Sequence, residues 1–452
     1  MGLYLKLAFG NVRRSARDYS VYFATLGFAA CLLYSFVASS DYLNRLDLSP
    51  DQMSVVASSG DILQAFSIFT VLVFLFLVRY ANRFLLRRRS REFALYKLVG
   101  MDRGAVSCVL VMETACVGVL ALALGVALSP AFGAITAFVF DVPWHPMVVF
   151  SSQSAVWTSG CFAAVFALNA FDGARNMGRR PLIELIAAER APEVASTGGR
   201  LARGVQVAAA AVLLAVVWGA CVFQPVYFIA FIIPMGFAAC FATALVARIV
   251  VTGWAARARR RTERYWRGLR AFTVRQVESR VASSSMALAC VCVLIAVSVC
   301  MMVAGFAFSV GMRTPELVSQ GLAASMAPIG FIGIFYGSVF LLSAVAVLSL
   351  QQLSGAADAR HAYASLAKLG CERADMALSV RKQVLLYFAA PFAGAMVHDV
   401  FGLFLVAFLA FALGTSGFFA ITGGVLLFTA ALLAVYGVLT SLAVERLCLA
   451  DA

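Results

Sequence analysis

Long apolar runs alternate with short charged segments along the whole chain. Each of ten runs is long enough to cross a bilayer as a helix, which takes about 20 mostly apolar residues. The runs are continuously apolar, whereas the strands of a membrane barrel would alternate apolar and polar positions. We therefore predict an all-α integral membrane protein with about ten transmembrane helices. The expected spans are 19–40, 61–85, 105–128, 148–170, 205–223, 227–250, 284–308, 327–350, 383–403 and 419–443.

The composition agrees with this pattern, since 62% of the 452 residues are hydrophobic and 13% are charged. Soluble domains carry about 25% charged residues. The net charge of +14 alone would suggest a nucleic-acid partner, but all Lys and Arg except Arg45 and Arg313 fall on one side if the N-terminus is cytoplasmic. This is the positive-inside asymmetry. We expect a multi-pass plasma-membrane protein with both termini cytoplasmic, in contact with the anionic lipid bilayer and without a nucleic-acid partner.

The chain shows no residue pattern that is typical of catalysis or metal binding. Most of its 11 cysteines fall inside the apolar runs, no CxxC pair occurs, and the three histidines lie far apart. Neither a disulfide framework nor a zinc site is expected. The nucleotide-binding pattern GxxxxGK[ST] is absent as well. We therefore expect no enzyme activity and no cofactor bound by this chain itself.

Two charged segments repeat at an offset of 270 positions, since 91–103 aligns with 361–373. A second similarity, at an offset near 265, links 7–15 with 272–280. Both copies start on the same side of the membrane, which indicates parallel repeats. We predict two parallel four-helix modules with a central two-helix insertion. The expected division is a first module at 1–175, a linker at 176–204, a central pair at 205–250, a basic segment at 251–283 and a second module at 284–452.

The repeated segments are candidate functional residues. From Arg91 to Gly100 a broad apolar surface is bordered by charges, and Gly100 suits the C-terminal cap of a short helix because glycine tolerates positive φ. Such a helix either merely joins two spans or docks a soluble partner. The duplication favours docking, because two copies offer two equivalent contacts to a dimeric cytoplasmic partner.

A basic segment, RARRRTERYWRGLR at 257–270, is a second candidate. Its Tyr265 and Trp266 suit the headgroup layer of a membrane. We interpret this segment as a basic helix that faces lipid, with docking of a partner protein as the alternative.

Four polar residues fall within or near the ends of expected spans, where such groups are candidates for function. Glu113 lies in the third span, and Gln383 takes the equivalent position in the second copy. Glu113 either hydrogen-bonds a neighbouring helix or takes part in conformational coupling. His398 and Asp399 are expected near the outer end of the ninth span, where the loop begins. His398 either hydrogen-bonds at the interface or responds to pH.

Three stretches resemble a known family: REFALYKLVGMDRGAV at 91–106, LKLAFGNVRRSARDYSVYF at 5–23, and AKLGCERADMALSVRKQVLLYFAAPFAGAMVHDVFGL at 367–403. They are similar to FtsX-like ABC transporter permeases of the bacitracin-exporter type. The resemblance implies a separate dimeric ATPase that binds ATP and Mg, and short helices that couple it to the permease. The implied coupling residues are Arg91, Glu92, Phe93, Tyr96, Lys97 and Gly100, and in the second copy His361, Tyr363, Lys368, Gly370 and Glu372.

The resemblance also implies a role against cell-wall-active peptide antibiotics and, in many members, a partner histidine kinase. Permeases of this type carry a large extracellular domain between spans seven and eight. Here that interval covers only 309–326, and a domain needs at least about 50 residues. Either the substrate binds within the membrane or a second permease supplies the domain.

Two other functions compete with this interpretation. The first is a membrane sensor or scaffold that regulates a kinase or a cell-wall hydrolase without transport. The second is a transporter driven by an ion gradient, which would need matched intramembrane acids in both halves. Glu113 opposite Gln383 does not provide such a match.

Overall fold

The structure is a computed structural model that describes residues 94–139, 151–179, 200–312 and 322–449, with scattered residues between Gly10 and Glu92. Every regular element in these ranges is a helix, which confirms the predicted all-α class. The chain forms two compact units. One comprises 1–46 and 67–192, and the other comprises 47–66 and 193–452.

The first unit contains two long described helices that pack against each other, α5 at Arg103–Val139 and α6 at Ser152–Arg179. Isolated helical residues from the N-terminal part contact them. The phenolic hydroxyl of Tyr34 accepts a hydrogen bond from the Ser151 backbone nitrogen at 3.1 Å, and the Asn82 amide donates to the Asn169 carbonyl at 3.1 Å.

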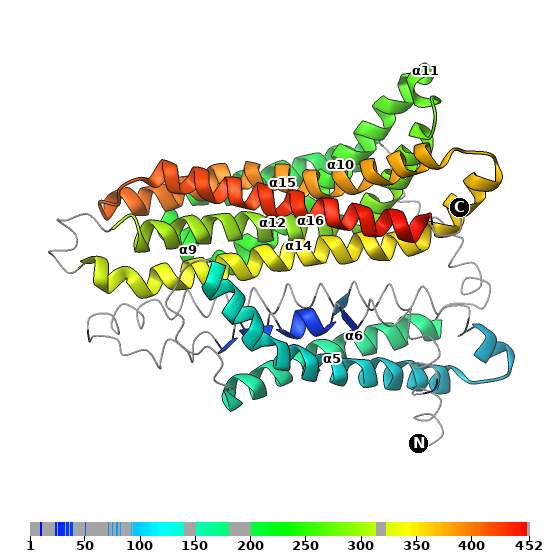
Figure 1. The fold of residues 1–452 in the computed structure, drawn as a ribbon, viewed down its shortest axis with the longest axis horizontal. Helices are drawn as coiled ribbons and strands as arrows, with labels where there is room; N and C mark the ends of the chain where they lie inside the picture. Colours follow the sequence, from blue (N-terminus) through cyan, green and yellow to red (C-terminus); the bar gives the residue numbers. More distant parts are fainter. Residues whose placement is uncertain are drawn as a thin grey trace. The chain divides into compact units, whose positions relative to one another are not determined.

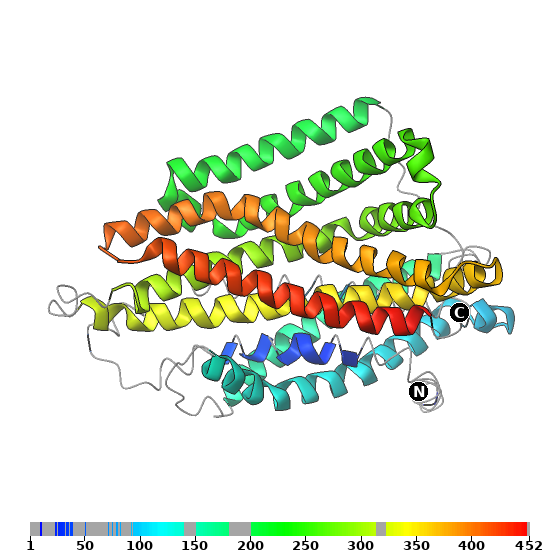
Figure 2. The same ribbon diagram turned by 45° about the horizontal axis from the view of Figure 1, so that its top comes forward.

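The second unit is a helical bundle. Its helices are α8 (Arg200–Phe223), α9 (Pro225–Ala230), α10 (Ile232–Arg260), α11 (Thr262–Tyr265), α12 (Arg270–Ser309), α14 (Leu322–Lys368), α15 (Arg373–Ala412) and α16 (Phe418–Cys448). Helices α12, α14, α15 and α16 run side by side (Figure 1), with α12 against α14 as the most extensive contact. The expected central pair, α8 and α10, lies along the α12–α15 side of this group, away from α14 (Figure 2).

Seven helices among the described residues are long and apolar enough to cross a membrane. They are Gly104–Pro130, Ala202–Phe223, Ile232–Arg260, Ser284–Ser309, Ile332–Ala356, Arg373–Ala412 and Phe418–Cys448, and each overlaps one predicted span. The run at 148–170 lies in α6, which is helical but is not among the seven. The runs at 19–40 and 61–85 fall mostly outside the described residues, apart from apolar helical residues between Leu26 and Ser35.

Backbone contact between α12 and α14 forms the centre of the second unit. A Cβ atom at Gly305 would lie 2.5 Å from the backbone nitrogen of Ile334, so only glycine fits there. About two turns away along α12, the Ser298 hydroxyl donates to the Gly337 carbonyl at 2.6 Å. Small residues let helix backbones approach within a membrane, where apolar burial alone does not hold helices together.

The helix α12 changes direction at Ser284, whose φ of −114° and ψ of 18° depart from helical values. The Ser284 hydroxyl donates to the Arg280 carbonyl at 2.6 Å. A side chain that bonds the preceding turn often accompanies a bend. The bend separates the first part of α12, residues 270–283, from its apolar part, which begins where the sequence predicts the seventh span.

The internal repeat is visible in the burial of two helix pairs. Seven buried positions of α5 lie 270 residues before buried positions of α15. The buried residues are Glu113, Thr114, Val117, Gly118, Ala121, Gly125 and Ser129 in α5, and Gln383, Val384, Tyr387, Phe388, Pro391, Ala395 and Asp399 in α15. Likewise Ser154, Thr158, Phe162 and Asn169 of α6 lie 271 residues before Val425, Thr429, Leu433 and Thr440 of α16. Each copy therefore packs with the same helix register.

At one contact, the two copies have glycine and phenylalanine in swapped positions. In the first unit, Gly118 of α5 faces the ring of Phe166 on α6. In the second unit, the equivalent positions are reversed, and Phe388 of α15 faces Gly437 of α16. One large and one small residue fill the same space from opposite sides, as dense packing requires.

Candidate functional site: two matching turn elements

The first turn element, residues 94–110, ends one helix and begins the next. The Gly100 N–H donates to the Lys97 carbonyl at 3.2 Å, and the Met101 N–H donates to the Tyr96 carbonyl at 3.0 Å. These two bonds are those of a Schellman cap, and Gly100 has the positive φ, +97°, that this cap needs. The prediction that Gly100 caps a helix is confirmed.

The second turn element, residues 364–380, has the same geometry. The Gly370 N–H donates to the Ala367 carbonyl at 3.0 Å, the Cys371 N–H donates to the Leu366 carbonyl at 3.1 Å, and φ of Gly370 is +85°. In one respect the structure differs from the expectation, because the preceding segment is not a separate short helix. It is the continuous end of α14, which runs from Leu322 to Lys368.

An acidic residue starts the next helix in both elements. The Asp102 carboxylate accepts a hydrogen bond from the Ala105 N–H at 2.8 Å, the arrangement of an N-cap. At the equivalent position, the side chain of Glu372 makes no capping bond. The backbone carbonyls of the two acidic residues behave alike: that of Glu372 accepts from the Met376 N–H at 3.2 Å, and that of Asp102 accepts from the Val106 N–H. A negative charge at a helix N-terminus is favourable in both cases.

Each turn element is fixed to its own unit by buried contacts. In the first, Ala94, Val106 and Leu110 form a small apolar cluster against which Tyr96 and Met101 pack. In the second, a polar network joins three helices: Gln383 of α15 donates to the hydroxyl of Tyr363 on α14 at 3.0 Å, and Ser379 lies 2.7 Å from Thr273 of α12. Burial raises the pKa of the Tyr363 phenol above its ordinary value. The turns are therefore rigid attachments rather than loose loops.

Apolar side chains are exposed at the tip of both turns. Val99 is 84% exposed and Leu369, at the equivalent position, is 80% exposed. Leu95 and Leu98 are exposed beside the first turn as well. Exposed apolar residues beside a rigid turn are suited to contact a partner protein. The sequence predicted an apolar surface over 91–100, which includes Leu95, Leu98 and Val99. It did not single out Leu369, although an apolar residue directly before the capping glycine in both copies was the available signal.

The expected coupling residues have different environments. Arg91 and Phe93 lie outside the described residues. Glu92, Tyr96 and Lys97 are half-buried, and the side chains of His361, Lys368 and Glu372 are exposed. Tyr363 is 1% exposed, so the expectation that it meets a partner directly is wrong: it anchors α14 to α15. The repeat alignment identified Tyr363 as a candidate, but only the fold shows that its side chain faces the interior.

The paired intramembrane residues Glu113 and Gln383 are both buried at equivalent positions, as the alignment predicted. Gln383 bonds Tyr363 and, at 3.3 Å, Ser379. Gln383 therefore hydrogen-bonds a neighbouring helix, α14, as well as its own.

The expectation that His398 and Asp399 mark the end of the ninth span is wrong. Helix α15 continues past both residues to Ala412, and the sequence from Val400 to Ala412 is apolar, so no turn begins at His398. His398 lies between three helices. Its Nδ1 accepts from the indole N–H of Trp218 on α8 at 3.2 Å, and its Nε2 lies 2.9 Å from the hydroxyl of Thr243 on α10. The two contacts together fit a neutral imidazole with its proton on Nε2.

Asp399 is 2% exposed and lies beside this group. The Cys300 thiol is directed at its Oδ1 at 3.6 Å, while Oδ2 has no hydrogen-bond partner among the described residues. Across the same residues, no three His, Cys, Asp or Glu side chains gather as metal ligands, and all 11 cysteines are free thiols. His398 thus links α15 to α8 and α10 through hydrogen bonds.

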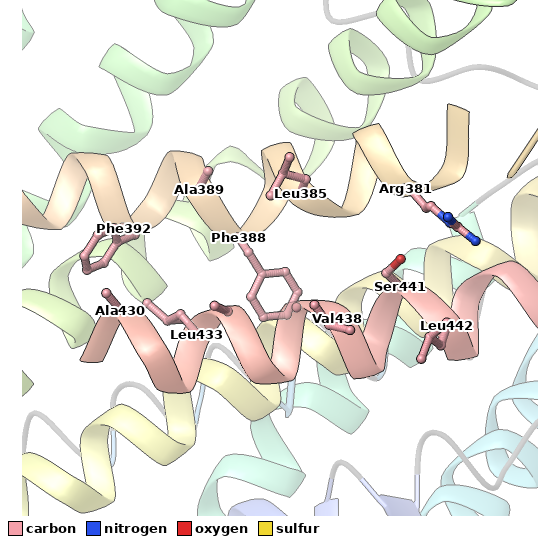
Figure 3. Close-up of a pocket in the computed structure, with 12 residues that line it drawn as sticks. Arg381, Leu385, Phe388, Ala389, Phe392, Ala430, Leu433, Val438, Ser441 and Leu442 are labelled. Carbon is pink, nitrogen blue, oxygen red and sulfur yellow. The ribbon is translucent and has the colours of Figure 1, made fainter. Parts of the chain in front are cut away.

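A groove of about 580 Å³ separates α15 from α16 on the surface of the second unit. Figure 3 shows Phe388 and Phe392 of α15 directed toward α16, with Arg381 at one end of the groove. Arg381 pairs with Glu445 of α16 at 2.9 Å. The lining is otherwise mostly apolar, as lipid-facing helix surfaces are.

Comparison with known proteins relates the first turn element and its helices to a permease family. Residues 64–171 match the family "FtsX-like permease C-terminal", and this range contains the first turn element, α5 and most of α6. The bacitracin export permease protein BceB of Bacillus subtilis is 25% identical over 167 residues, which cover 36% of this chain and 25% of that protein. The ABC transporter permease protein YxdM of Bacillus subtilis is 24% identical over 172 residues, covering 37% and 27% respectively. The matched part of the chain thus covers about a quarter of the full length of each of these curated relatives.

Proposed function

This chain carries an FtsX-like permease domain and is homologous to ABC transporter permeases, and on that basis we propose that a separate ATPase drives it through the two turn elements. The observation that carries this proposal is the shared geometry of the turns. Both have the same Schellman bonds, an acidic residue at the start of the next helix and an exposed apolar tip, Val99 or Leu369. A dimeric ATPase offers two identical surfaces and needs two equivalent contacts.

The rigidity of each turn supports a mechanical role. Helix α15 begins four residues after Leu369 and is 40 residues long, which gives it a length of about 60 Å at 1.5 Å per residue. A displacement at the turn moves the start of α15 directly, because the Gly370 cap and the Tyr363 network leave no loose segment between them. In this proposal the ATPase binds ATP and Mg, and this chain converts ATPase closure into helix movement.

Purification of the tagged chain from its native membrane in mild detergent tests the proposal. We expect an ATPase to co-purify at about two copies per permease, together with ATP hydrolysis. The double variant Val99→Asp/Leu369→Asp should reduce the recovered ATPase by at least about tenfold, since a charge buried in an apolar contact costs more than about 1.4 kcal/mol.

Val310→Asp is the matched control, because Val310 is an equally apolar, 51% exposed residue at the C-terminal end of α12 and belongs to neither turn element. It should retain the ATPase. Equal loss in this control would contradict a specific contact at the turns. Recovery of a histidine kinase or a cell-wall hydrolase without an ATPase would instead establish a sensor or scaffold.

The substrate proposal follows the relatives, one of which is named for bacitracin export. We propose that the chain acts against cell-wall-active peptide antibiotics in the plasma membrane, with both termini in the cytoplasm. Helix α12 ends at Ser309 and α14 begins at Leu322, so the connection between them is too short for a domain of about 50 residues. Contact with a peptide then involves the membrane-embedded surface or a second permease.

Deletion of the gene in the source organism tests this part. We expect the inhibitory concentration of bacitracin to fall at least about fourfold, with that of a non-peptide antibiotic unchanged, and a plasmid copy of the native gene to restore resistance. Complementation by Val99→Asp/Leu369→Asp should fail. Unchanged peptide resistance on deletion would contradict the substrate class while leaving the ATPase contact to its own test.

A further inference from the structure

A cavity of about 580 Å³ lies where α10 ends and the chain returns through α11 into α12. Figure 1 shows α11 at the end of α10. Five arginine side chains line this cavity: Arg257, Arg260, Arg261, Arg264 and Arg270. The remaining lining residues are apolar or aromatic and include Trp254 and Tyr265. All five are exposed, so the cavity is open to solvent, and their like charges favour the binding of an anion between them.

The turn that forms this cavity is anchored to α10 and α12 by buried apolar side chains. Tyr265 is buried with Ala255 of α10 and Val274 of α12 in a small apolar cluster. Its ring also contacts that of Trp266 edge-on, at a centroid distance of 5.2 Å. These contacts fix α11 between the ends of two long helices, so the arginines are presented by a defined turn rather than by a free tail.

None of the five arginines makes an ion pair with an acidic side chain in the described part of the chain, although acids are near in sequence. Glu278 pairs with Arg259, which does not line the cavity. Glu263 of α11 is not among the lining residues either. The cavity therefore keeps an uncompensated positive charge.

The cavity lies at the boundary between the apolar and polar parts of a span. Helix α10 is a candidate membrane span that ends in Arg257, Arg259 and Arg260. Trp254 is 39% exposed and Trp266 is 70% exposed at the same end. Tryptophan at this depth is typical of the headgroup layer, which is also where the phosphates of anionic lipids lie.

We propose that this arginine cavity is a binding site for a phosphate group, carried by the headgroup of an anionic phospholipid. Guanidinium groups bind phosphate oxygens in pairs through parallel N–H bonds, which makes arginine well suited to this ligand. The apolar part of the lining would contact the glycerol and upper acyl chain. The inference does not rest on the ATPase proposal.

Native mass spectrometry and thermal unfolding of the full-length chain in detergent test the proposal, with phosphatidylglycerol, phosphatidylcholine and inorganic phosphate as probes. We expect phosphatidylglycerol to bind at least about tenfold more tightly than phosphatidylcholine and to raise the unfolding temperature. The double variant Arg261→Gln/Arg264→Gln should lose this preference, since each charge-assisted bond contributes about tenfold or more in affinity.

The variant Arg267→Gln/Arg203→Gln is the control, because it removes the same charge from arginines that do not line the cavity. It should keep the preference for phosphatidylglycerol. An equal loss in the control would show diffuse charge attraction and overturn the site. Saturation by inorganic phosphate at the same concentration would assign the cavity to a soluble anion and overturn the lipid assignment. Absence of any preference in the native chain, with its fold intact by circular dichroism, would also overturn it.

Discussion

At the scale of single residues, two glycines decide where helices end. Gly100 and Gly370 lie in open space, so a side chain at either position would meet no neighbouring atom. Their positive φ values alone explain the requirement for glycine, because other residues adopt this conformation at a cost of about 1 kcal/mol or more.

Gly370→Ala should therefore lower the free energy of unfolding by about 1 kcal/mol. The control is Gly423→Ala in α16, where glycine also meets nothing within 4 Å but has no positive φ. There alanine should be neutral or stabilise the helix by up to about 1 kcal/mol. Thermal unfolding in detergent measures the difference. Equal effects of the two variants would show that the left-handed turn carries no strain for alanine.

The hydrogen bonds of His398 are a second residue-scale feature, because they join α15 to the central pair. Thr243→Val removes the hydroxyl beside Nε2 while it keeps the volume, and should destabilise the fold by about 1–3 kcal/mol by leaving a buried polar atom unsatisfied. Thr252→Val is the control, since the Thr252 hydroxyl bonds only its own helix. Denaturation midpoints compare the two. A Thr243 variant as stable as the Thr252 variant would contradict a structural role for the contact.

At the scale of elements, the glycine–phenylalanine exchange shows that the two hairpins share one packing scheme. A Cβ atom at Gly118 would lie 2.9 Å from the Phe166 ring, whereas one at Gly437 would lie 3.5 Å from Phe388. The first distance demands that the ring shift, and the second is an ordinary contact.

We therefore expect Gly118→Ala to destabilise the chain by about 1–3 kcal/mol through overpacking, and Gly437→Ala to have little effect. In a Phe166→Leu background the effect of Gly118→Ala should shrink, because the ring that it meets is gone. A double-mutant cycle by thermal unfolding gives this coupling. Additive effects would contradict direct contact between residues 118 and 166.

At the scale of the whole molecule, the ends of α14 fix the expected orientation in the membrane. This helix is 47 residues long, or about 70 Å at 1.5 Å per residue, so its two ends lie on opposite sides of a bilayer. Leu369 directly follows α14, whereas Val310 ends α12 next to Ser309, which lies against Gly330 near the start of α14. The positive-inside pattern places Leu369 on the cytoplasmic side and Val310 outside.

Val310→Cys should react with a membrane-impermeant maleimide in intact cells, and Leu369→Cys only after permeabilisation. The chain without an added cysteine gives the background from the 11 native thiols. Labelling of position 369 but not 310 in intact cells would invert the proposed topology.

Much of the molecule follows from the sequence alone. The apolar runs predicted helices at seven places where the structure has candidate spans, because burial of about 20 apolar residues in lipid leaves the helix as the only structure that satisfies the backbone. The offset of 270 predicted that Gly100 and Gly370 would be equivalent, and a capping glycine depends only on local backbone geometry. Both features are local, so neighbouring residues are enough to determine them.

Only the tertiary structure decided which side chains each helix buries and which it leaves for partners. Tyr363 was expected at a partner surface and is an anchor, while Val99 and Leu369 are exposed. His398 was expected at a helix end and lies between α8, α10 and α15. The arginine cavity likewise needs α10, α11 and α12 to be brought together. In a membrane protein nearly every span is apolar on all sides, so periodicity does not mark the buried face, and contacts between helices distant in sequence decide it.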